Sequence, residues 1–358
     1  MALGTIDTNQ IASEAVTVPK VIDQVLTNRN LLINGAMNLA QRNSAGISAT
    51  GIGSLNSGEY YAQDRWNFFA YGSPAARWTQ SVSTDVPASS TFTSSLKLDC
   101  TTASGTVGAG HRQQLMQVIE AQDLQHLRYG SSAAKKITVS FWVKSSVTGK
   151  NYCWIYQNDG AEFIYKSYTV NSADTWERKV ITFTGNTATP IQNDNGAGLN
   201  IIWMLYVGSD YTSDSGGSED TWQSWSAGNY DQFHGQVNNA SSTSNNWYLT
   251  GTQVEVGDSD TPFEHEHHSV TLAKCQRYYQ EYVSYKLYFN GTNEPSSEVG
   301  NSRLLPVVMR GIPVIGNKSS THGSAGAFSA NTHSIRYITV SSHGSGGFDV
   351  GFDLDADF

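Results

Sequence analysis

The sequence predicts a mainly β protein whose central part is a β-sandwich of the jelly-roll kind. Only 15% of the 358 residues are charged, 11% are aromatic and 33 are glycine, a composition typical of loop-rich β proteins. Residues 137–144 have a period of two in which one face, Ile137, Val139, Phe141 and Val143, is apolar throughout, as expected for a strand with one buried face. Clusters of Gly, Ser, Asn and Asp separate several such runs, with no regular alternation of helices, which favours a sandwich.

The first 29 residues differ from the rest because they are short of aromatic residues and hold too few apolar ones for a core. They are either a flexible tail or an attachment segment that orders on a partner. The apolar residues that would make the attachment contacts are Ile6, Ile11, Val16, Val18 and Val21.

Residues 30–268 are expected to form the sandwich. Residues 137–144, 176–184 and 247–256 have strand patterns, and residues 200–207 are almost continuously apolar, as in a strand covered on both faces. One helical interruption is expected at residues 111–127. There the apolar residues recur at helical spacing before Gly130.

A second helix is expected over residues 269–285, as a connector with Ser269 as its N-cap. Its apolar face either packs into the chain's own core or contacts sister copies around a threefold axis, and the pattern leaves both open. Residues 286–358 have strand patterns again and predict a small C-terminal β domain with a thin core. The helix face consists of Leu272, Cys275, Tyr279 and Tyr282.

Charge and cysteine content exclude several classes of function. The formal net charge of −9 argues against binding nucleic acid, and no apolar run is long enough to insert in a membrane. The start lacks the features of a signal peptide. Cys100, Cys153 and Cys275 are far apart and predict neither a disulfide framework nor a zinc site. We therefore expect a chain made in a reducing cytoplasm without secretion, whose surface suits work outside the cell, as in a virion.

Motifs for catalysis are missing from the sequence: it has no GxSxG, HExxH or P-loop pattern. We expect no enzyme and no cofactor. The alternative is a glycan hydrolase, which needs two carboxylates across a cleft. Carboxylates in or near the predicted strands are Glu162, Glu177, Glu255 and Glu264.

The long connection over residues 208–246 mixes aromatic and acidic residues. Sugars stack their C–H faces on aromatic rings while carboxylates and amides bind the hydroxyls, so this loop is the candidate for glycan contact. The alternative is that Trp222 and Trp225 hold the loop onto the sandwich. The glycan candidates are Tyr211, Trp222, Trp225 and Tyr230.

Two further clusters have a chemical and a structural interpretation. His265 and His267 could bind a transition metal if three chains brought them together around an axis, but a solvated turn is expected. Asp349, Asp353, Asp355 and Asp357 could form a calcium loop, but an exposed strand end is expected.

Six segments between residues 30 and 279 resemble, in the same order along the chain, a family of phage tail-fibre and appendage proteins of marine phages and prophages. The central region of that family is similar to a carbohydrate-binding-module jelly roll. The last 50 or so residues resemble the family more loosely, through 306–313 and 353–357, and residues 6–22 resemble segments near the base of phage fibres. The matching segments are Asn30–Met37, Asp64–Trp66, Ser140–Ser145, Leu249–Gly257, Thr261–His265 and Cys275–Tyr279.

The resemblance implies a structural virion protein, a short tail fibre that assembles as a homotrimer. Its N-terminus would join a tail, baseplate or adaptor protein, and its distal part would contact a host cell-surface polysaccharide. The chain departs from long fibres because it has no repetitive shaft. Two alternatives remain: a head-bound fibre or structural connector without receptor binding, and a tailspike that depolymerises glycans.

Overall fold

The computed structural model describes residues 28–43, 49–52, 58–60, 62–212, 218–225, 232–289, 298–320, 327–340 and 346–358. The attachment residues Ile6, Ile11, Val16, Val18 and Val21, and the glycan candidate Tyr230, lie outside these ranges. No helix in the described part of the chain is long and apolar enough to span a bilayer.

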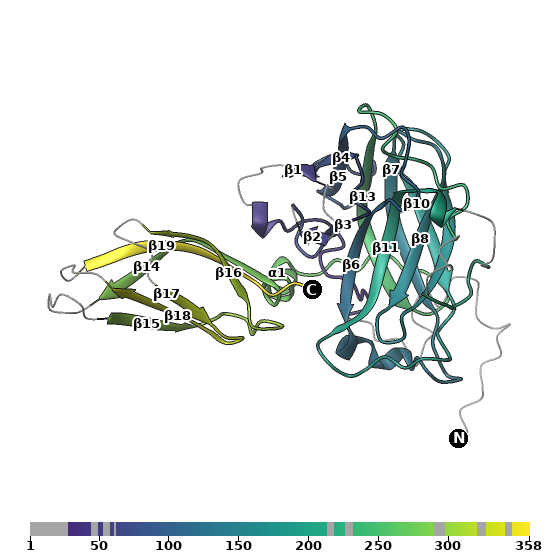
Figure 1. Cartoon of the computed structure of the whole chain (residues 1–358). Coiled ribbons are helices and arrows are strands. Elements are labelled where there is room, and N and C mark those ends of the chain that lie inside the picture. Colours follow the sequence, from purple (N-terminus) through teal and green to yellow (C-terminus); the bar gives the residue numbers. More distant parts are fainter. Residues whose placement is uncertain are drawn as a thin grey trace, which may run out of the picture.

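Two antiparallel sheets form a β-sandwich (Figure 1), so the predicted mainly β fold is confirmed. The six-stranded sheet has the order β1 (Ala49–Ile52), β4 (Arg77–Ser83), β5 (Ser95–Thr102), β13 (Asn246–Val256), β7 (Ile137–Ser145) and β10 (Glu177–Phe183). The seven-stranded sheet has the order β12 (Gln223–Ser224), β9 (Glu162–Val170), β8 (Gly149–Gln157), β11 (Ala197–Val207), β6 (Arg112–Glu120), β3 (Asn67–Tyr71) and β2 (Gly58–Tyr60). Short 3-10 helices lie at Gln41–Asn43 (η2), Ala121–Leu127 (η3) and Ser209–Tyr211 (η4).

The sandwich core lies between the two sheets and contains the inward side chains of both. Phe141 of β7 and Trp203 of β11 are fully buried, and their rings pack edge to face with centroids 5.6 Å apart. Trp66 contacts Trp203 from the segment before β3, at 5.5 Å. Each such side chain contributes about 1.5–3 kcal/mol by leaving water. The predicted strands at 137–144, 176–184, 200–207 and 247–256 correspond to β7, β10, β11 and β13.

The helix expected over residues 111–127 is wrong: β6 occupies Arg112–Glu120 and only the 3-10 helix η3 follows. β6 pairs with β11 on one side and with β3 on the other, so neighbouring strands satisfy its backbone groups. Its inward-facing Gln117 is buried as well, and bonds the N–H and the carbonyl of Ile33 at 2.7 and 2.8 Å. The apolar residues of β6 have helical spacing because buried polar residues such as Gln117 interrupt the two-residue alternation of the strand.

The helix expected over residues 269–285 is also too long, because α1 spans only His268–Gln276 and β14 (Tyr279–Phe289) follows. Pairing with β19 (Gly346–Asp355) draws the chain into a strand, with Tyr279 opposite Asp355 and Tyr282 opposite Phe352. The N-cap is His267 rather than Ser269, because the His267 side chain accepts from the Ser269 N–H.

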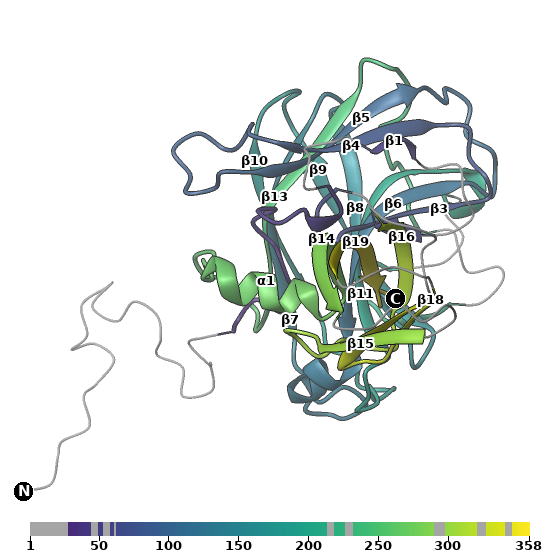
Figure 2. The same ribbon diagram turned by 90° about the vertical axis from the view of Figure 1, so that its left-hand side faces the viewer.

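The C-terminal β domain consists of two three-stranded sheets and extends away from the sandwich, with α1 at the junction (Figures 1 and 2). One sheet has the order β14, β19 and β16 (Val314–Ser320); the other has β15 (Glu298–Leu304), β18 (Ser334–Val340) and β17 (Ala327–Ala330). The buried apolar cluster described in this domain is small. It consists of Met309, Ile335, Phe352, Leu354 and Ala356.

Ion pairs join the C-terminal domain to the sandwich. Asp357 pairs with Arg65 and Arg42 of the sandwich, and its side chain is only 4% exposed. Asp355 also pairs with Arg42, at 2.8 Å. The expectation that these aspartates form an exposed strand end is therefore wrong for Asp357, because two arginines from the other domain surround its carboxylate.

Candidate functional site

The outer face of the seven-stranded sheet carries a cluster of aromatic side chains. Alternation in β8 points Cys153 and Ile155 into the core, so Trp154 and Tyr156 point outward. In the antiparallel register Trp154 lies opposite Tyr165, and Tyr156 opposite Phe163. Outward residues of β11 complete the apolar base of this face. The cluster is built on Tyr152, Trp154, Phe163, Tyr165, Ile202, Met204, Tyr211 and Phe233.

The segment that follows β11 covers part of this face. Trp225 stacks on Trp154, with ring centroids 5.6 Å apart and an interplanar angle of 17°. Its backbone N–H donates to the Ala161 carbonyl at 2.7 Å, which fixes its position at the start of β9. Phe233 packs edge to face on Tyr152 at 5.4 Å. The covering segment is therefore held in place by aromatic packing.

Arg112, at the start of β6, sits among the rings at the edge of this cover. Its Nη1 donates to the Tyr211 hydroxyl at 3.0 Å. Its guanidinium carbon lies 4.6 Å from the ring centre of Tyr71, 5.1 Å from Trp225 and 5.2 Å from Tyr211. Cation–π contacts of this kind attract the guanidinium to the aromatic rings around it. The side chain of Tyr71 is 43% exposed, so this edge of the aromatic face is open to solvent.

The glycan candidates among the described residues differ in their burial and in their contacts. Tyr211 is buried, and Trp222 donates its indole N–H to the Thr184 carbonyl at 2.8 Å and packs edge to face on Tyr129. Trp222 and Trp225 both pack the covering segment onto the sandwich, which is the role that the structural alternative gives to these two residues. Trp225 is half-buried beside Arg112. Sugar contact by any of them stays a prediction.

The sequence reasoning missed Tyr71 and Arg112. The run Asn67–Tyr71 is too short to show alternation clearly. Tyr71 lies opposite Arg112 in the β3–β6 register, and this pairing alone places them together. An arginine at the start of a strand gives no signal by itself.

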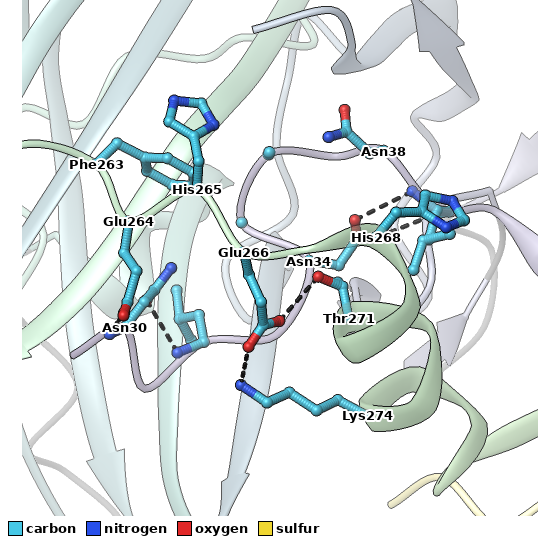
Figure 3. Close-up of a pocket in the computed structure, with 14 residues that line it drawn as sticks. Asn30, Asn34, Asn38, Phe263, Glu264, His265, Glu266, His268, Thr271 and Lys274 are labelled. Atoms are coloured by element: carbon cyan, nitrogen blue, oxygen red, sulfur yellow. Dashed lines mark hydrogen bonds and ion pairs between the residues drawn. The ribbon is translucent and has the colours of Figure 1, made fainter. Parts of the chain in front are cut away.

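A small cavity of about 90 Å³ lies beside the histidine cluster, between α1 and residues 30–39 (Figure 3). Glu266 accepts from Thr271 at 2.8 Å and pairs with Lys274, while Glu264 accepts from the Asn30 N–H at 2.9 Å. These contacts join the turn before α1 to the helix and to the first described segment.

The two candidate metal ligands have different neighbours. His265 Nε2 lies 2.6 Å from Thr91 Oγ1, and its ring packs against Phe263 and Phe92. His267 Nδ1 lies 2.8 Å from Ser269 Oγ at the start of α1. Within the described residues of one chain, no group of three His, Cys, Asp or Glu side chains is arranged to hold a metal ion. A site shared between chains stays a prediction.

The four carboxylates considered for hydrolysis each accept hydrogen bonds from another segment of the chain. Glu255 is buried and accepts from the Thr261 N–H and hydroxyl at 2.8 and 2.7 Å. Glu162 accepts from Asn186 at 2.6 Å, and Glu177 accepts from the backbone N–H groups of Asn171 and Ser172 at 2.8 Å. Glu264 accepts from Asn30, as described above. These contacts give each carboxylate a structural role.

The helix face considered for a threefold contact is used inside the chain. Cys275 and Tyr279 are buried, and the Arg42 guanidinium lies 4.0 Å from the Tyr279 ring centre. Tyr282 stacks on Phe352 at 4.8 Å, and Leu272 is half-buried. Burial raises the pKa of the Cys275 thiol, which keeps it protonated. Of the two alternatives, intrachain packing describes Cys275, Tyr279 and Tyr282.

Comparison with known protein families finds no match, and no curated protein matches the chain. Among solved structures, a tailspike domain of bacteriophage CBA120 matches with 11% identity and a TM-score of 0.33, over 64% of this chain and 21% of its own. The family 11 carbohydrate-binding module of a Clostridium thermocellum cellulase matches with 12% identity and a TM-score of 0.27, over 63% and 100%. A xylan-binding domain from Paenibacillus barcinonensis matches with 11% identity and a TM-score of 0.28, over 60% and 97%.

Proposed function

We propose that this chain is a structural virion protein, a short phage tail fibre that contacts host-surface glycans through its sandwich and assembles as a homotrimer. Its N-terminal segment joins a tail, baseplate or adaptor protein. The proposal starts from the resemblance of six ordered sequence segments to phage appendage proteins, and the geometry of the aromatic face supports it.

The observation that carries the glycan-binding part is the group formed by Tyr71, Arg112 and Trp225. Aromatic faces stack on the C–H faces of a pyranose, and a guanidinium donates hydrogen bonds to its hydroxyls. Arg112 is 9% exposed and lies within 4.6–5.1 Å of both ring centres, so its guanidinium lies directly beside the two rings on which a sugar would stack. Strand pairing already holds Tyr71 in place, and stacking on Trp154 holds Trp225. Both side chains therefore lose little conformational entropy when a sugar binds.

The C-terminal domain supports the assembly part, because its described residues include large apolar side chains that are exposed. Leu304, Ile312 and Val314 are 76%, 75% and 73% exposed, and Val308 is 46% exposed. We call these four residues the apolar patch. A second copy is the occupant we propose, since exposed apolar side chains are stabilised when equivalent surfaces bury them against each other. Three sites of about millimolar affinity, linked in one trimer, bind a repetitive polysaccharide much more tightly than one site does.

The glycan-binding part is tested by screening the full-length chain on an array of neutral and acidic polysaccharides, including host lipopolysaccharide. For a glycan that binds, Tyr71→Ala and Trp225→Ala should each weaken binding at least about fivefold, the loss of one stacking contact. Val82→Ala, at a residue 41% exposed on the other sheet, is the matched control and should bind as the unchanged chain does. Unchanged binding by both aromatic variants would refute the site, and release of sugar from the bound polysaccharide would favour the depolymerase alternative.

A further inference from the structure

The outer face of the six-stranded sheet carries a second group of aromatic and charged side chains, brought together by strand register. Lys97 of β5 lies opposite Tyr248 of β13, and Tyr248 lies opposite Lys144 of β7. The three side chains therefore form one row across the sheet. Trp176, immediately before β10, extends the row, and its ring packs edge to face on Tyr248 at 5.9 Å and 67°.

Ion pairs fix the lysines of this row. Lys144 pairs with Asp85 from the loop after β4, and its ammonium lies 4.1 Å from the Tyr248 ring centre. Lys97 lies 2.7 Å from Asp99 on the same strand and 5.6 Å from the Tyr248 ring centre. Two cations and two anions make the formal charge of this group zero.

Trp176 is held rigidly at the surface. Its indole N–H donates to Asp85 Oδ1 at 2.9 Å, and the Lys144 ammonium lies 5.6 Å from its ring centre. The residue is partly exposed and follows the exposed turn at residues 171–175. A tryptophan that is already fixed loses little conformational entropy when a ligand stacks on it.

We propose that Trp176, with Asp85, Lys97, Lys144 and Tyr248, forms a second carbohydrate site that takes an uncharged pyranose. The sugar stacks on the indole, and its hydroxyls, which both donate and accept hydrogen bonds, meet the Asp85 carboxylate and the Lys97 ammonium. Lys144 and Tyr248 are buried and hold these groups from below. A uronate would lie against Asp85 and Asp99, and an amino sugar against the lysines, so neither gains a net attraction. A charged sugar would therefore lose hydration without compensation, whereas a neutral pyranose has no charge to desolvate.

This inference rests on the proposed glycan-binding function but uses a different surface. The first site lies on the outer face of the seven-stranded sheet, and this one on the outer face of the six-stranded sheet. A chain with both sites binds two sugar segments on opposite faces, which raises avidity for a polysaccharide layer.

The experiment is a ¹⁹F NMR titration of the full-length chain labelled with 5-fluorotryptophan, with the Trp176 resonance assigned by its loss in Trp176→Phe. The probes are neutral gluco-, xylo- and galacto-hexasaccharides, and an oligo-galacturonate as the acidic comparison. At millimolar concentration a neutral hexasaccharide should shift the Trp176 resonance and the oligo-galacturonate should not. Absence of a shift with every neutral probe, or a shift with the galacturonate alone, would overturn the proposal.

Variants separate the two sites. Asp85→Asn keeps a side chain near the indole but removes its charge, and should weaken the Trp176 shift about threefold or more, whereas Tyr71→Ala should leave the shift unchanged. Val180→Ala, at an exposed residue of β10, is the control and should titrate as the unchanged chain does. Retained binding at Trp176 with no effect of Tyr71→Ala on array binding would refute only the first site; the reverse result would refute only this one.

Discussion

Arg277 and Glu120 form a two-point ion pair: Nε and Nη2 of Arg277 lie 2.7 and 2.8 Å from the two carboxylate oxygens of Glu120. The Tyr278 hydroxyl donates to the same carboxylate at 2.6 Å. Glu120 ends β6 of the sandwich, and Arg277 lies between α1 and β14, so this pair fastens the C-terminal domain to the sandwich. The pairing of Asp357 with Arg42 and Arg65 adds further ion pairs to this junction.

Glu120→Gln should lower the free energy of unfolding by about 2–3 kcal/mol. The Glu120 side chain is fully buried, and the substitution leaves the Arg277 guanidinium without its countercharge there. Urea unfolding at pH 7 measures the loss, and limited proteolysis should cut the variant faster near residue 277. Asp258→Asn is the matched control: Asp258 and Lys136 are 4.0 Å apart and mostly exposed, and the change should cost less than about 0.5 kcal/mol. Equal effects of the two substitutions would contradict the proposed role of the junction.

The pH dependence of the same pair has a definite sign. Burial by itself would raise the pKa of Glu120, but the hydrogen bonds from Arg277 and Tyr278 outweigh it and hold the pKa below the ordinary value of 4.5. A carboxylate with a lowered pKa contributes stability above its unfolded-state pKa and loses it as the pH falls through the folded-state pKa. The stability difference between the unchanged chain and Glu120→Gln should therefore be largest at neutral pH and shrink below about pH 4.5.

Gly251 should tolerate no side chain. It has a φ of 57° at the register shift of β13, and a Cβ there would meet the Phe92 ring and Trp142. Gly251→Ala should lower the free energy of unfolding by about 2 kcal/mol, from the left-handed backbone and the displaced Phe92. Gly105→Ala, where a Cβ meets nothing within 4 Å, is the control for thermal unfolding. A melting temperature as high as that of the control variant would show that Phe92 moves aside without cost.

The apolar patch should determine assembly. Light scattering of the unchanged chain should give a mass of three chains at micromolar concentration. Leu304→Asp combined with Ile312→Asp should reduce that mass to one chain, because two charges would be buried in the contact. Val82→Asp, at an exposed residue of the sandwich, should leave the mass unchanged. A single-chain mass for the unchanged protein would refute the homotrimer.

Trp222→Phe should separate the structural role of the covering segment from glycan contact. The change keeps a ring against Tyr129 but removes the hydrogen bond to the Thr184 carbonyl, so stability should fall by about 1 kcal/mol. Glycan binding should stay as it is, in contrast with Trp225→Ala. Weaker binding by Trp222→Phe at unchanged stability would restore Trp222 as a sugar contact.

The helix errors show where sequence patterns stop being informative. Residues 137–144 predict β7 correctly because one face of that strand is wholly apolar, and this pattern can be read from neighbouring residues alone. β6 hides its alternation because Gln113 and Gln117 are buried in place of apolar residues, which only distant partners such as Ile33 and Trp78 make possible. Tyr279 and Tyr282 keep helical spacing, yet pairing with β19 places them in a strand.

The sequence by itself determined the mainly β fold and the positions of the sandwich strands β7, β10, β11 and β13, because alternation records which side chains leave water. It also indicated aromatic residues in the segment after β11. Only the tertiary structure decided which strands are neighbours. Register places Tyr71 beside Arg112, aligns Lys97, Tyr248 and Lys144 in one row, and buries Asp357 between two arginines of the other domain. Alternation says which face of a strand a residue occupies, whereas the contacts that build a site depend on backbone pairing and packing between segments far apart in the chain.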